Sequence, residues 1–431
     1  MLLKVDEKMV NLAIIGSGIG GGSAAYFTRK YLPDSKITVY EKENRVGGRV
    51  LTYDDGKNKS ELGAAFFNFN NKLIYELVKE LNLNIKRVEE AKGIALWNGN
   101  EIFFKASQPK FYNMLKLIAT YKFNVPKLII RLKEAEKKIK KLYRTHIPTE
   151  FWELFESTGL DNWYRKRFDQ ILVEMGIDQG FIDEIITPIT RIIYSQDATL
   201  GGFAGLSSLL GVYGESVYSL SEGNDVLPSK LIEASNSKVE LKSEVESVEK
   251  TSTDSFRVTV GGATSIFDGL IIASPLETAN ITFDGVSNQK WNEREYQKIY
   301  IRLMKGEIKT GYFNLDKSAK LPAIILTTKE ADPITRFSIN KSEKNESLIT
   351  ITSKDPIENE ILDKIFKDGR TVIDQTWSAA YPVFNPIEKL PATFIYKKLI
   401  YLNAIESAAS SLESSTFAAL NGIKMMKEQL G

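Results

Sequence analysis

An α/β fold is predicted for this chain by three features of its sequence. The first is an apolar run, 12–15, followed by the glycines of G-x-G-x-x-G and small helix-compatible residues. The second is another apolar run, 37–40, that ends at an acid. The third is a length of 431 residues with 43% hydrophobic composition, enough for two or three domains. Together they indicate a Rossmann-type nucleotide-binding domain joined to further structure.

The glycine loop is expected to turn a strand sharply into a helix. Gly16 permits the tight turn, Gly18 lets the backbone approach a pyrophosphate, and Gly21 allows the helix to pack closely on the strand. Gly20 lies in the same loop and is counted among the cofactor contacts. The positive end of the helix dipole then faces the phosphate charge.

An acid follows the second strand at the spacing that a nucleotide domain needs. Glu41 lies twenty positions after Gly21, where a carboxylate accepts hydrogen bonds from two ribose hydroxyls. A carboxylate there also disfavours the additional phosphate of NADP. Lys42, directly after it, is assigned to the same cofactor site.

The next segment favours a flavin over a nicotinamide. In "NRVGGRV", Gly48 frees the backbone beside Arg49, whose guanidinium is suited to phosphate oxygens. The following "SELGAAFFN", which contains Gly63 and Ala64, resembles the pattern of FAD enzymes of the amine oxidase type. FAD is therefore the expected cofactor.

Three distant segments are expected to complete this site. Residues 238–250 alternate as one strand with Val245 near its functional end, and 267–277 form a buried strand that includes Ala273. Near the C-terminus, a turn with Glu406 and Ser407 precedes a small-residue helix, and Glu406 is expected to hydrogen-bond a cofactor hydroxyl.

The order of these segments predicts two discontinuous domains. The FAD-binding domain comprises 1–70, 221–284 and 396–431, and an α+β substrate domain comprises 71–220 and 285–395. Residues 71–220 read as mostly helical, whereas 285–395 read as strands. The substrate domain is thus expected to be a mixed sheet with a helical insert, holding substrate over the flavin.

Composition excludes several function classes. The formal net charge is only +2, the chain has no cysteine, and its single histidine is His146. The near-neutral charge argues against nucleic-acid binding, the lack of cysteine excludes a cysteine nucleophile, and a single histidine argues against a metal site. The charged start of the chain is a poor secretory signal, and no apolar run would span a membrane, so a cytoplasmic location is expected.

One stretch, 110–144, departs from this neutral balance. It carries eleven basic residues against two acidic ones, interleaved with leucine and isoleucine. The pattern predicts either peripheral contact with an anionic membrane or a solvated pair of lysine-rich helices.

Later motifs resemble the prenylcysteine oxidase family over most of the chain. They include "RIIYSQDATLGGFAGLSSLLG", "ELGAAFFNFNN", "MKGEIKTGYF" and "NAIESAASSLESS". Two departures are the lack of the secretory signal of eukaryotic members, and Asn68 where a histidine is expected. The resemblance implies FAD, a lipid-like thioether substrate, and hydride transfer from the carbon beside the sulfur to flavin N5. Oxygen is then reduced to hydrogen peroxide as aldehyde and thiol are released.

This chemistry needs orientation and electrostatics from the protein rather than a nucleophile. Lys305, in the matching "MKGEI", is the candidate for positioning water or oxygen. The substrate-pocket candidates are the aromatic residues Tyr194, Phe203, Trp377 and Tyr381. Two alternatives stay open: a flavin amine oxidase or isoprenoid or carotenoid desaturase, and a non-catalytic prenyl-binding protein resembling Rab GDP-dissociation inhibitors.

Overall fold

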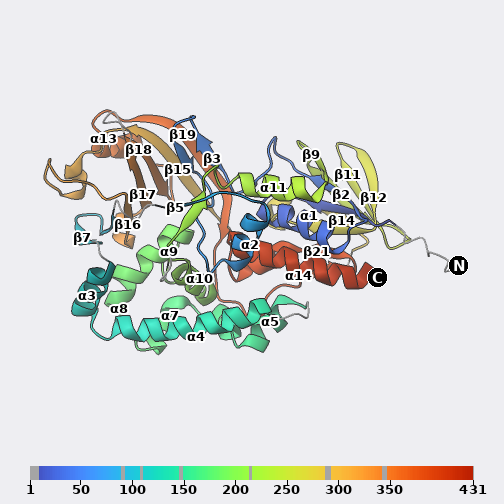
Figure 1. The fold of residues 1–431 in the computed structure, drawn as a ribbon, viewed down its shortest axis with the longest axis horizontal. Coiled ribbons are helices and arrows are strands. Elements are labelled where there is room, and N and C mark those ends of the chain that lie inside the picture. The colour runs from blue at the N-terminus through green and yellow to red at the C-terminus, as the bar shows by residue number, and fades with distance from the viewer. Residues whose placement is uncertain are drawn as a thin grey trace.

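Two lobes lie side by side along the long axis of the molecule (Figure 1). The computed structural model describes residues 9–88, 93–106, 110–144, 149–212, 216–286, 293–341 and 347–430, and His146 lies outside them. One lobe holds a six-stranded sheet with a smaller sheet beside it, and the other holds a seven-stranded sheet.

The six-stranded sheet has the nucleotide-binding arrangement that the sequence predicts. Its order is β20 (Phe394–Tyr396), β21 (Leu399–Tyr401), β13 (Gly269–Ile272), β1 (Asn11–Ile15), β2 (Lys36–Tyr40) and β9 (Lys238–Glu240). All neighbours pair in parallel except β20 with β21. Leu12, Ile14 and Ile271 are fully buried, because both faces of this sheet are covered.

Three helices pack together beside this sheet. The central one, α1 (Ile19–Tyr31), contacts both α11 (Val226–Ser235) and α14 (Leu412–Leu430). The small residues of α1 allow this close approach, since Ser23, Ala24 and Ala25 are all fully buried. The last helix of the chain therefore packs on the first.

The smaller sheet corrects one expectation. Residues 238–250 form two strands instead of one: β9 joins the parallel sheet, and β10 (Val245–Lys250) joins a second sheet with β11 (Phe256–Val260), β12 (Ala263–Phe267) and β14 (Thr282–Asp284). The chain turns between them because Lys242 adopts a left-handed conformation with φ 52°, and its N–H bonds to the Glu43 carbonyl.

The second lobe is built on the sheet β19-β15-β18-β17-β16-β6-β7. Its strands are β6 (Ile94–Trp97), β7 (Ile102–Lys105), β15 (Tyr296–Gly306), β16 (Ile324–Thr327), β17 (Ile334–Lys341), β18 (Ser347–Ser353) and β19 (Arg370–Pro382). The β6–β7 hairpin comes from the region expected to be mostly helical. Its apolar strands flank a turn at Gly99, which has φ 86°, and β6 pairs with β16.

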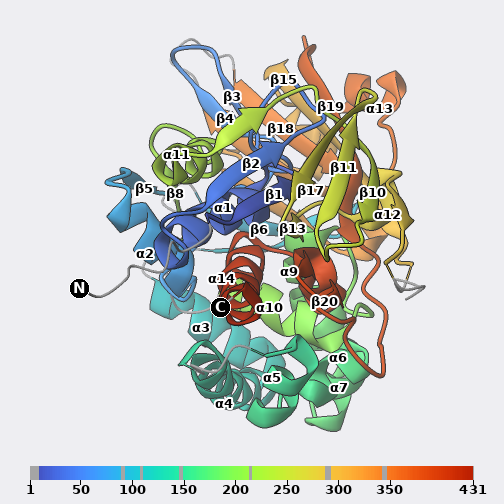
Figure 2. The ribbon, with the colours of Figure 1, turned by 90° about the vertical axis from the view of Figure 1, so that its right-hand side faces the viewer.

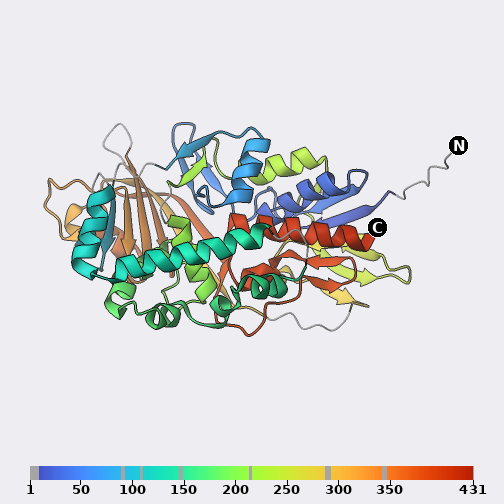
Figure 3. The same cartoon turned by 60° about the horizontal axis from the view of Figure 1, so that its bottom comes forward.

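A layer of helices lies at the bottom of the molecule in Figure 1 and faces the viewer in Figure 3. It comprises α3 (Lys110–Tyr121), α4 (Asn124–Arg144), α5 (Phe151–Thr158), α6 (Asp161–Arg165), α7 (Phe168–Glu174), α8 (Gln179–Phe181), α9 (Thr187–Tyr194) and α10 (Gly202–Val212). Figure 2 shows α4 and α5 at the base of the molecule, below α14. Because α9 packs on β16 and β17, it joins this layer to the seven-stranded sheet.

The remaining elements are short. They are α2 (Lys72–Glu80), α12 (Leu276–Ala279), α13 (Asn359–Ile365), the pair β3 (Thr52–Asp54) with β4 (Lys59–Glu61), and the pair β5 (Ile85–Arg87) with β8 (Tyr218–Leu220). A π-helical turn, η2 (Ile182–Ile186), and the 3₁₀ turns η3 (Thr310–Phe313), η4 (Lys329–Ala331) and η5 (Leu402–Ser407) complete the described elements. Among the described residues, no helix is long and apolar enough to cross a membrane.

Candidate functional site

A cavity of about 510 Å³ lies where the two lobes meet. It opens at the carboxyl ends of the parallel strands, where β1, β2 and β13 end at Ile15, Tyr40 and Ile272. This edge is where open α/β sheets bind nucleotides. Residues of β15, β17, β18 and β19 line the other side of the same cavity.

The glycine loop brings α1 directly onto the end of β1. Gly16 has φ 102°, and a Cβ there would lie 2.9 Å from the Ala273 carbonyl oxygen. A Cβ at Gly21 would overlap the Gly16 carbonyl oxygen. No side chain caps the N-terminus of α1, and its first residues, Gly18 and Ile19, line the cavity. The first-turn N–H groups and the helix dipole are therefore available to an anion.

Two observations support the fit of FAD's pyrophosphate to this loop. A Cβ at Gly18 would meet no described atom closer than the Gly48 Cα at 3.7 Å, so protein packing does not itself demand glycine there. In addition, the Ser274 hydroxyl lines the cavity and is buried without a hydrogen-bond partner in the described part of the chain. Space beside Gly18 and an unsatisfied hydroxyl both suit a polar ligand.

Hydrogen bonds hold the Glu41 carboxylate in place, and the carboxylate can still accept a further one. Its Oε2 accepts the Ser17 N–H at 2.9 Å and the Ser17 hydroxyl at 2.6 Å, while its Oε1 accepts the Glu43 N–H at 2.9 Å. A carboxylate offers about four acceptor positions, so room for one ribose hydroxyl remains. The prediction of two ribose contacts requires the Ser17 hydroxyl to turn away.

Arg49 lies against Glu406 instead of standing free for phosphate. Its guanidinium forms an ion pair with the Glu406 carboxylate and donates to the Ala380 carbonyl at 3.1 Å. Glu406 is fully buried and also accepts the Tyr296 hydroxyl at 2.8 Å. Burial would raise the pKa of Glu406, but Arg49 and Arg294 hold this pKa below its usual value. The carboxylate thus stays ionised and holds Arg49 at the cavity wall.

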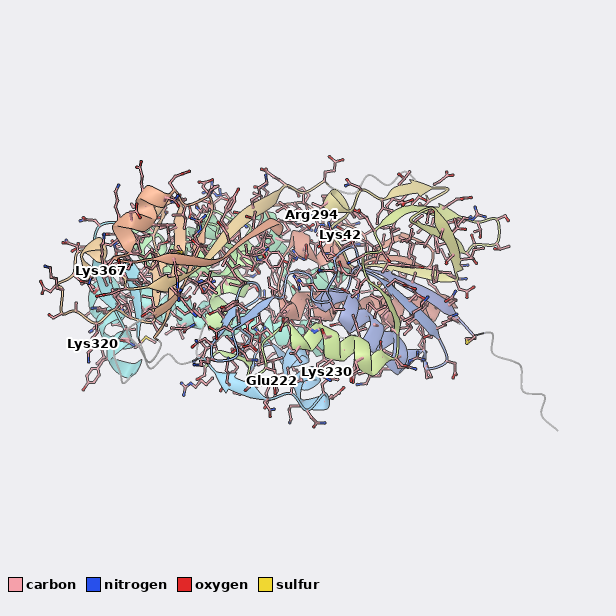
Figure 4. All side chains as sticks on the ribbon, turned by 90° about the horizontal axis from the view of Figure 1, so that it is seen from above. Lys42, Glu222, Lys230, Arg294, Lys320 and Lys367 are labelled. Atoms are coloured by element: carbon pink, nitrogen blue, oxygen red, sulfur yellow. The ribbon has the colours of Figure 1, made fainter. Side chains whose placement is uncertain are left out.

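A second arginine ties the lobes together nearby. Figure 4 labels Arg294 in the middle part of the molecule. Its Nε donates to Glu277 at 2.6 Å, and its Nη1 donates to the Asn403 carbonyl at 2.6 Å. Since Arg294 directly precedes β15 of the second lobe, while Glu277 and Asn403 belong to the first, this contact fixes the position of one lobe against the other.

Most of the cofactor residues predicted from sequence line the cavity. They are Gly16, Gly18, Glu41, Lys42, Gly48, Arg49, Gly63, Ala64, Val245 and Ala273. Four do not line it. Gly20 faces Ala273 and Ser415, Gly21 packs on Gly16, and Ser407 lies in the 3₁₀ turn with Glu406.

The expected contact of Glu406 with a cofactor hydroxyl is not supported. Its carboxylate is enclosed by protein donors, including the Ser410 hydroxyl at 3.2 Å. The helix that follows is placed as expected, because Ser411, Leu412 and Ser415 at the start of α14 line the cavity.

The substrate-pocket candidates divide into two pairs. Trp377 and Tyr381 on β19 line the cavity, and the Trp377 indole N–H donates to the Leu62 carbonyl at 2.7 Å. Tyr194 is fully buried behind Tyr381, with ring centroids 5.1 Å apart. Phe203 packs on Phe155 in the helical layer at 4.7 Å. Neither Tyr194 nor Phe203 lines the cavity, and of the two only Tyr194 packs on one of its wall residues.

Lys305 lies away from the cavity, which corrects its assignment as the catalytic candidate. Its ammonium pairs with Asp55 at 3.2 Å. Ile299 and Ile301 of the same strand do line the cavity. Lys305 shares their face of β15, but it is four residues beyond Ile301, or about 13 Å along a strand. The matching motif thus belongs to a strand that lines the cavity through Ile299 and Ile301, whereas Lys305 itself does not line it.

Asn68 also lies elsewhere, in a structural position. Its side-chain amide donates to the Leu210 and Gly211 carbonyls at 3.1 and 3.0 Å, joining the segment after β4 to α10. Other cavity residues carried no sequence signal. They include Ile192, Ile193 and Ser195 at the end of α9, Ile299 and Ile301 of β15, Arg336 of β17 and Thr352 of β18. Ile192, Ile193 and Ser195 belong to the "RIIYSQ" stretch, in which the sequence predicted Tyr194 as the pocket residue.

Comparisons with known proteins agree with this geometry. The profile of the prenylcysteine lyase family matches residues 104–430, and that of an NAD(P)-binding Rossmann-like domain matches residues 14–81. Farnesylcysteine lyase of Arabidopsis thaliana is 27% identical over 96% of this chain and 88% of its own length. Prenylcysteine oxidase 1 of Rattus norvegicus is 28% identical over 95% of this chain and 87% of its own length.

Solved structures share the fold at lower identity. A double mutant of putrescine oxidase aligns with a TM-score of 0.65 and 14% identity, covering 97% of this chain and 99% of its own. Cyclohexylamine oxidase of Brevibacterium oxydans aligns with a TM-score of 0.62 and 14% identity, covering 98% of this chain and 99% of its own. The two-lobed architecture is therefore that of these oxidases.

Proposed function

The chain belongs to the prenylcysteine lyase family, and from this premise we propose that it is an FAD-dependent oxidase acting on a prenyl or other lipid-like thioether. One observation carries the proposal: the nucleotide cradle and the isoleucines of the second lobe line a single cavity. Gly16 and Gly18 would hold the cofactor's phosphates at one side of this cavity, and Ile299 and Ile301 at the other side are suited to an apolar chain. The names of the two relatives, farnesylcysteine lyase and prenylcysteine oxidase 1, support this substrate class.

The proposed reaction balances without a protein nucleophile. The carbon beside the sulfur gives up a hydride, water supplies an oxygen to that carbon, and the carbon–sulfur bond breaks. Aldehyde and thiol leave, while molecular oxygen takes two electrons and two protons to become hydrogen peroxide. FAD supplies the hydride acceptor when bound. The chain orients the thioether and excludes bulk water from the cavity.

Particular residues serve this orientation. Trp377 is held by its hydrogen bond to Leu62, so its ring is a fixed wall of the cavity. Tyr381 is braced from behind by Tyr194. On the nucleotide side, Glu41 supplies the ribose acceptor, and the first turn of α1 supplies amide donors.

The decisive test is anaerobic flavin reduction. Purified protein is expected to be yellow, to release FAD on denaturation, and to lose its visible absorbance when mixed with farnesylcysteine without oxygen. Admitting oxygen then restores the absorbance and forms farnesal and hydrogen peroxide. Reduction by amines or a carotenoid precursor, with none by farnesylcysteine, would overturn the thioether proposal. A colourless protein that takes up no FAD would favour the non-catalytic alternative.

We further propose that α3 and α4 contact an anionic membrane surface. Exposed apolar side chains gather along α3 and the turn after it, including Leu115, Ile118 and Phe123, the last 75% exposed. Exposed lysines accompany them at Lys116 and Lys122. A face that combines apolar and basic side chains is suited to the headgroup region of an anionic bilayer.

Vesicle co-sedimentation tests this contact. The protein is expected to bind phosphatidylserine vesicles at low salt and to be released as salt rises, because screening weakens charge attraction. Phe123→Ser combined with Lys122→Glu should lower the bound fraction at least fivefold. Lys424→Glu, on the distant α14, serves as the matched control. Equal binding to neutral vesicles would contradict a contact that depends on anionic lipid, and no binding, or binding unaffected by the double variant, would show that this helix pair does not contact the membrane.

A further inference from the structure

Arg336 is a cavity residue with hydrogen-bond donors left over. It lies on β17, lines the cavity, and its Nη2 donates to the Thr352 hydroxyl at 3.1 Å. Its Nε is buried without an acceptor among the described residues. Within that part of the chain, no carboxylate lies within 4.0 Å of its guanidinium. Among the residues that the structure describes, the Thr352 hydroxyl is therefore the one side-chain partner of this charge.

Other arginines in the interior are paired with acids. Arg191 is fully buried and contacts Asp197 at 2.8 Å and Asp332 at 2.7 Å. Arg294 pairs with Glu277, and Arg49 pairs with Glu406. A buried charge without a counterion is costly, so proteins normally supply one. Arg336 has no such acid among the described residues, and unlike Arg45, which also lines the cavity and donates to three backbone carbonyls, it keeps an N–H group without an acceptor there.

No acid in the described part of the chain influences Arg336 from further away. Burial lowers the pKa of Arg336, and the opposing influence comes from the Tyr381 hydroxyl alone. Among the other cavity residues, the nearest on its own sheet are Thr352 and the apolar Ile301 of β15, the strand beyond β18. An anion entering the cavity would supply the missing partner. A guanidinium is particularly suited to a carboxylate, which it can bind through two N–H groups.

The phosphates of FAD are poorly placed to be that anion. Their cradle lies at Gly16, Gly18 and α1 in the first lobe, whereas Arg336 belongs to the sheet of the second lobe. That sheet contributes the isoleucines proposed to hold the prenyl chain. The unpaired charge thus lies on the substrate side of the cavity.

We propose that Arg336 binds the carboxylate of the substrate's cysteine part and is therefore the residue that determines specificity for the free acid over its neutral derivatives. This inference rests on the proposed function. Thr352 holds the guanidinium in place while the prenyl chain lies against the isoleucines. The carbon beside the sulfur is then fixed between a charged anchor and an apolar one, which orients it for oxidation.

The test compares farnesylcysteine with its methyl ester, which lacks the negative charge. In the unaltered protein, KM for the acid should be about tenfold to hundredfold below KM for the ester, the size expected of a charge-assisted hydrogen bond. Arg336→Met should raise KM for the acid alone and remove the difference between the two compounds. Arg336→Lys should restore part of it. Arg302→Met, on β15 of the same sheet, is the control and should keep the full difference.

A binding measurement separates this role from a structural one. S-dodecylcysteine and its methyl ester, whose carbon beside the sulfur is not activated by a double bond, can be titrated against the flavin spectrum to give Kd values. Arg336→Met should abolish the preference for the acid with an unchanged FAD spectrum. Equal Kd values for acid and ester in the unaltered protein would overturn the inference while leaving the thioether proposal intact. An Arg336→Met variant with altered FAD affinity, or with acid and ester weakened equally, would assign Arg336 to the cofactor or the fold. Flavin reduction by neither farnesyl compound would defeat the proposed function itself.

Discussion

The two ends of the cavity recognise their ligands by different means. At the nucleotide end, recognition comes from the backbone: the turn at Gly16, the amides of α1 and the close approach of Gly18 to Gly48. At the other end, it comes from side chains that project from a sheet, such as Ile301, Arg336 and Trp377. The first end therefore depends on which residues have no side chain, and the second on which side chains are present.

This difference shows which parts of the fold tolerate a change of side chain and which do not. The glycine loop between strand and helix tolerates little substitution, because any Cβ at Gly16 or Gly21 would meet backbone atoms. A sheet face accepts many side chains without loss of the fold. Putrescine oxidase and cyclohexylamine oxidase, by their names, act on amines and share this architecture with the present chain at 14% identity.

The largest expected effect comes from filling the nucleotide end. Gly18→Val should reduce FAD affinity at least a hundredfold, because its methyl groups occupy the space left for the pyrophosphate. The fold itself should persist, since nothing in the described protein lies closer than 3.7 Å to the new Cβ. FAD affinity can be measured by fluorescence titration of the apoprotein. Gly180→Val, at a glycine with nothing described within 4 Å, is the control. Unchanged FAD affinity would contradict the backbone account of this end.

An intermediate effect is expected from a buried carboxyl beside the nucleotide end. Glu413 on α14 accepts the N–H groups of Leu73 and Ile74 at 3.0 Å each, and burial raises its pKa from 4.5 to about 7. The folded chain then binds more protons than the unfolded chain between these pH values. The free energy of unfolding should therefore fall as pH rises through this range, by on the order of 2 kcal/mol.

Chemical denaturation at pH 5 and pH 8 measures this dependence. Glu413→Gln should reduce it by this amount without abolishing it, because burial also raises the pKa of Glu61 to about 7, whereas Glu330→Gln, at an exposed position, should leave it as it was. A Glu413→Gln variant with the full pH dependence would show that the nucleotide end does not rely on this group.

The smallest effect is expected at Lys305, and it sharpens the description of the sheet end. Lys305→Met should change kcat by less than about twofold, because the ammonium pairs with Asp55 and lies about 13 Å along β15 from the cavity residue Ile301. Steady-state oxygen consumption with farnesylcysteine measures it. Ile301→Asn, placed on the same strand face within the cavity, should raise KM strongly under the same assay. A large loss of kcat in Lys305→Met would restore its catalytic role.

The nucleotide lobe could be predicted from sequence almost element by element. Strand, turn, helix and acid follow one another from Leu12 to Glu41, so local spacing alone identifies them. The C-terminal strand, turn and helix were likewise predictable. The division of 238–250 between two sheets was not, because the alternation continues across Lys242 and only a backbone turn separates the strands.

The sheet end of the cavity could not be predicted in the same way. Which residues of β15, β17 and β19 face the cavity depends on strand register, and the pairing of β15 with β19 is shifted by bulges after Gln297 and Leu303. Arg336 lies in an ordinary alternating strand and carries no local signal. The β6–β7 hairpin was missed because its partner strand β16 is more than two hundred residues away in sequence.

The chain passes between the two lobes more than once, and this affects how the protein folds during its synthesis. The parallel sheet places β1 beside β13, and β13 beside β21, so its strands come from residues 11–15, 269–272 and 399–401. The helix packed on α1 ends at Leu430. Strands that leave the ribosome first must wait for partners synthesised last, and this delay slows folding and exposes unpaired edges. A ribosome stalled before residue 399 should therefore carry a nascent chain bound by chaperones and sensitive to protease, with no affinity for FAD.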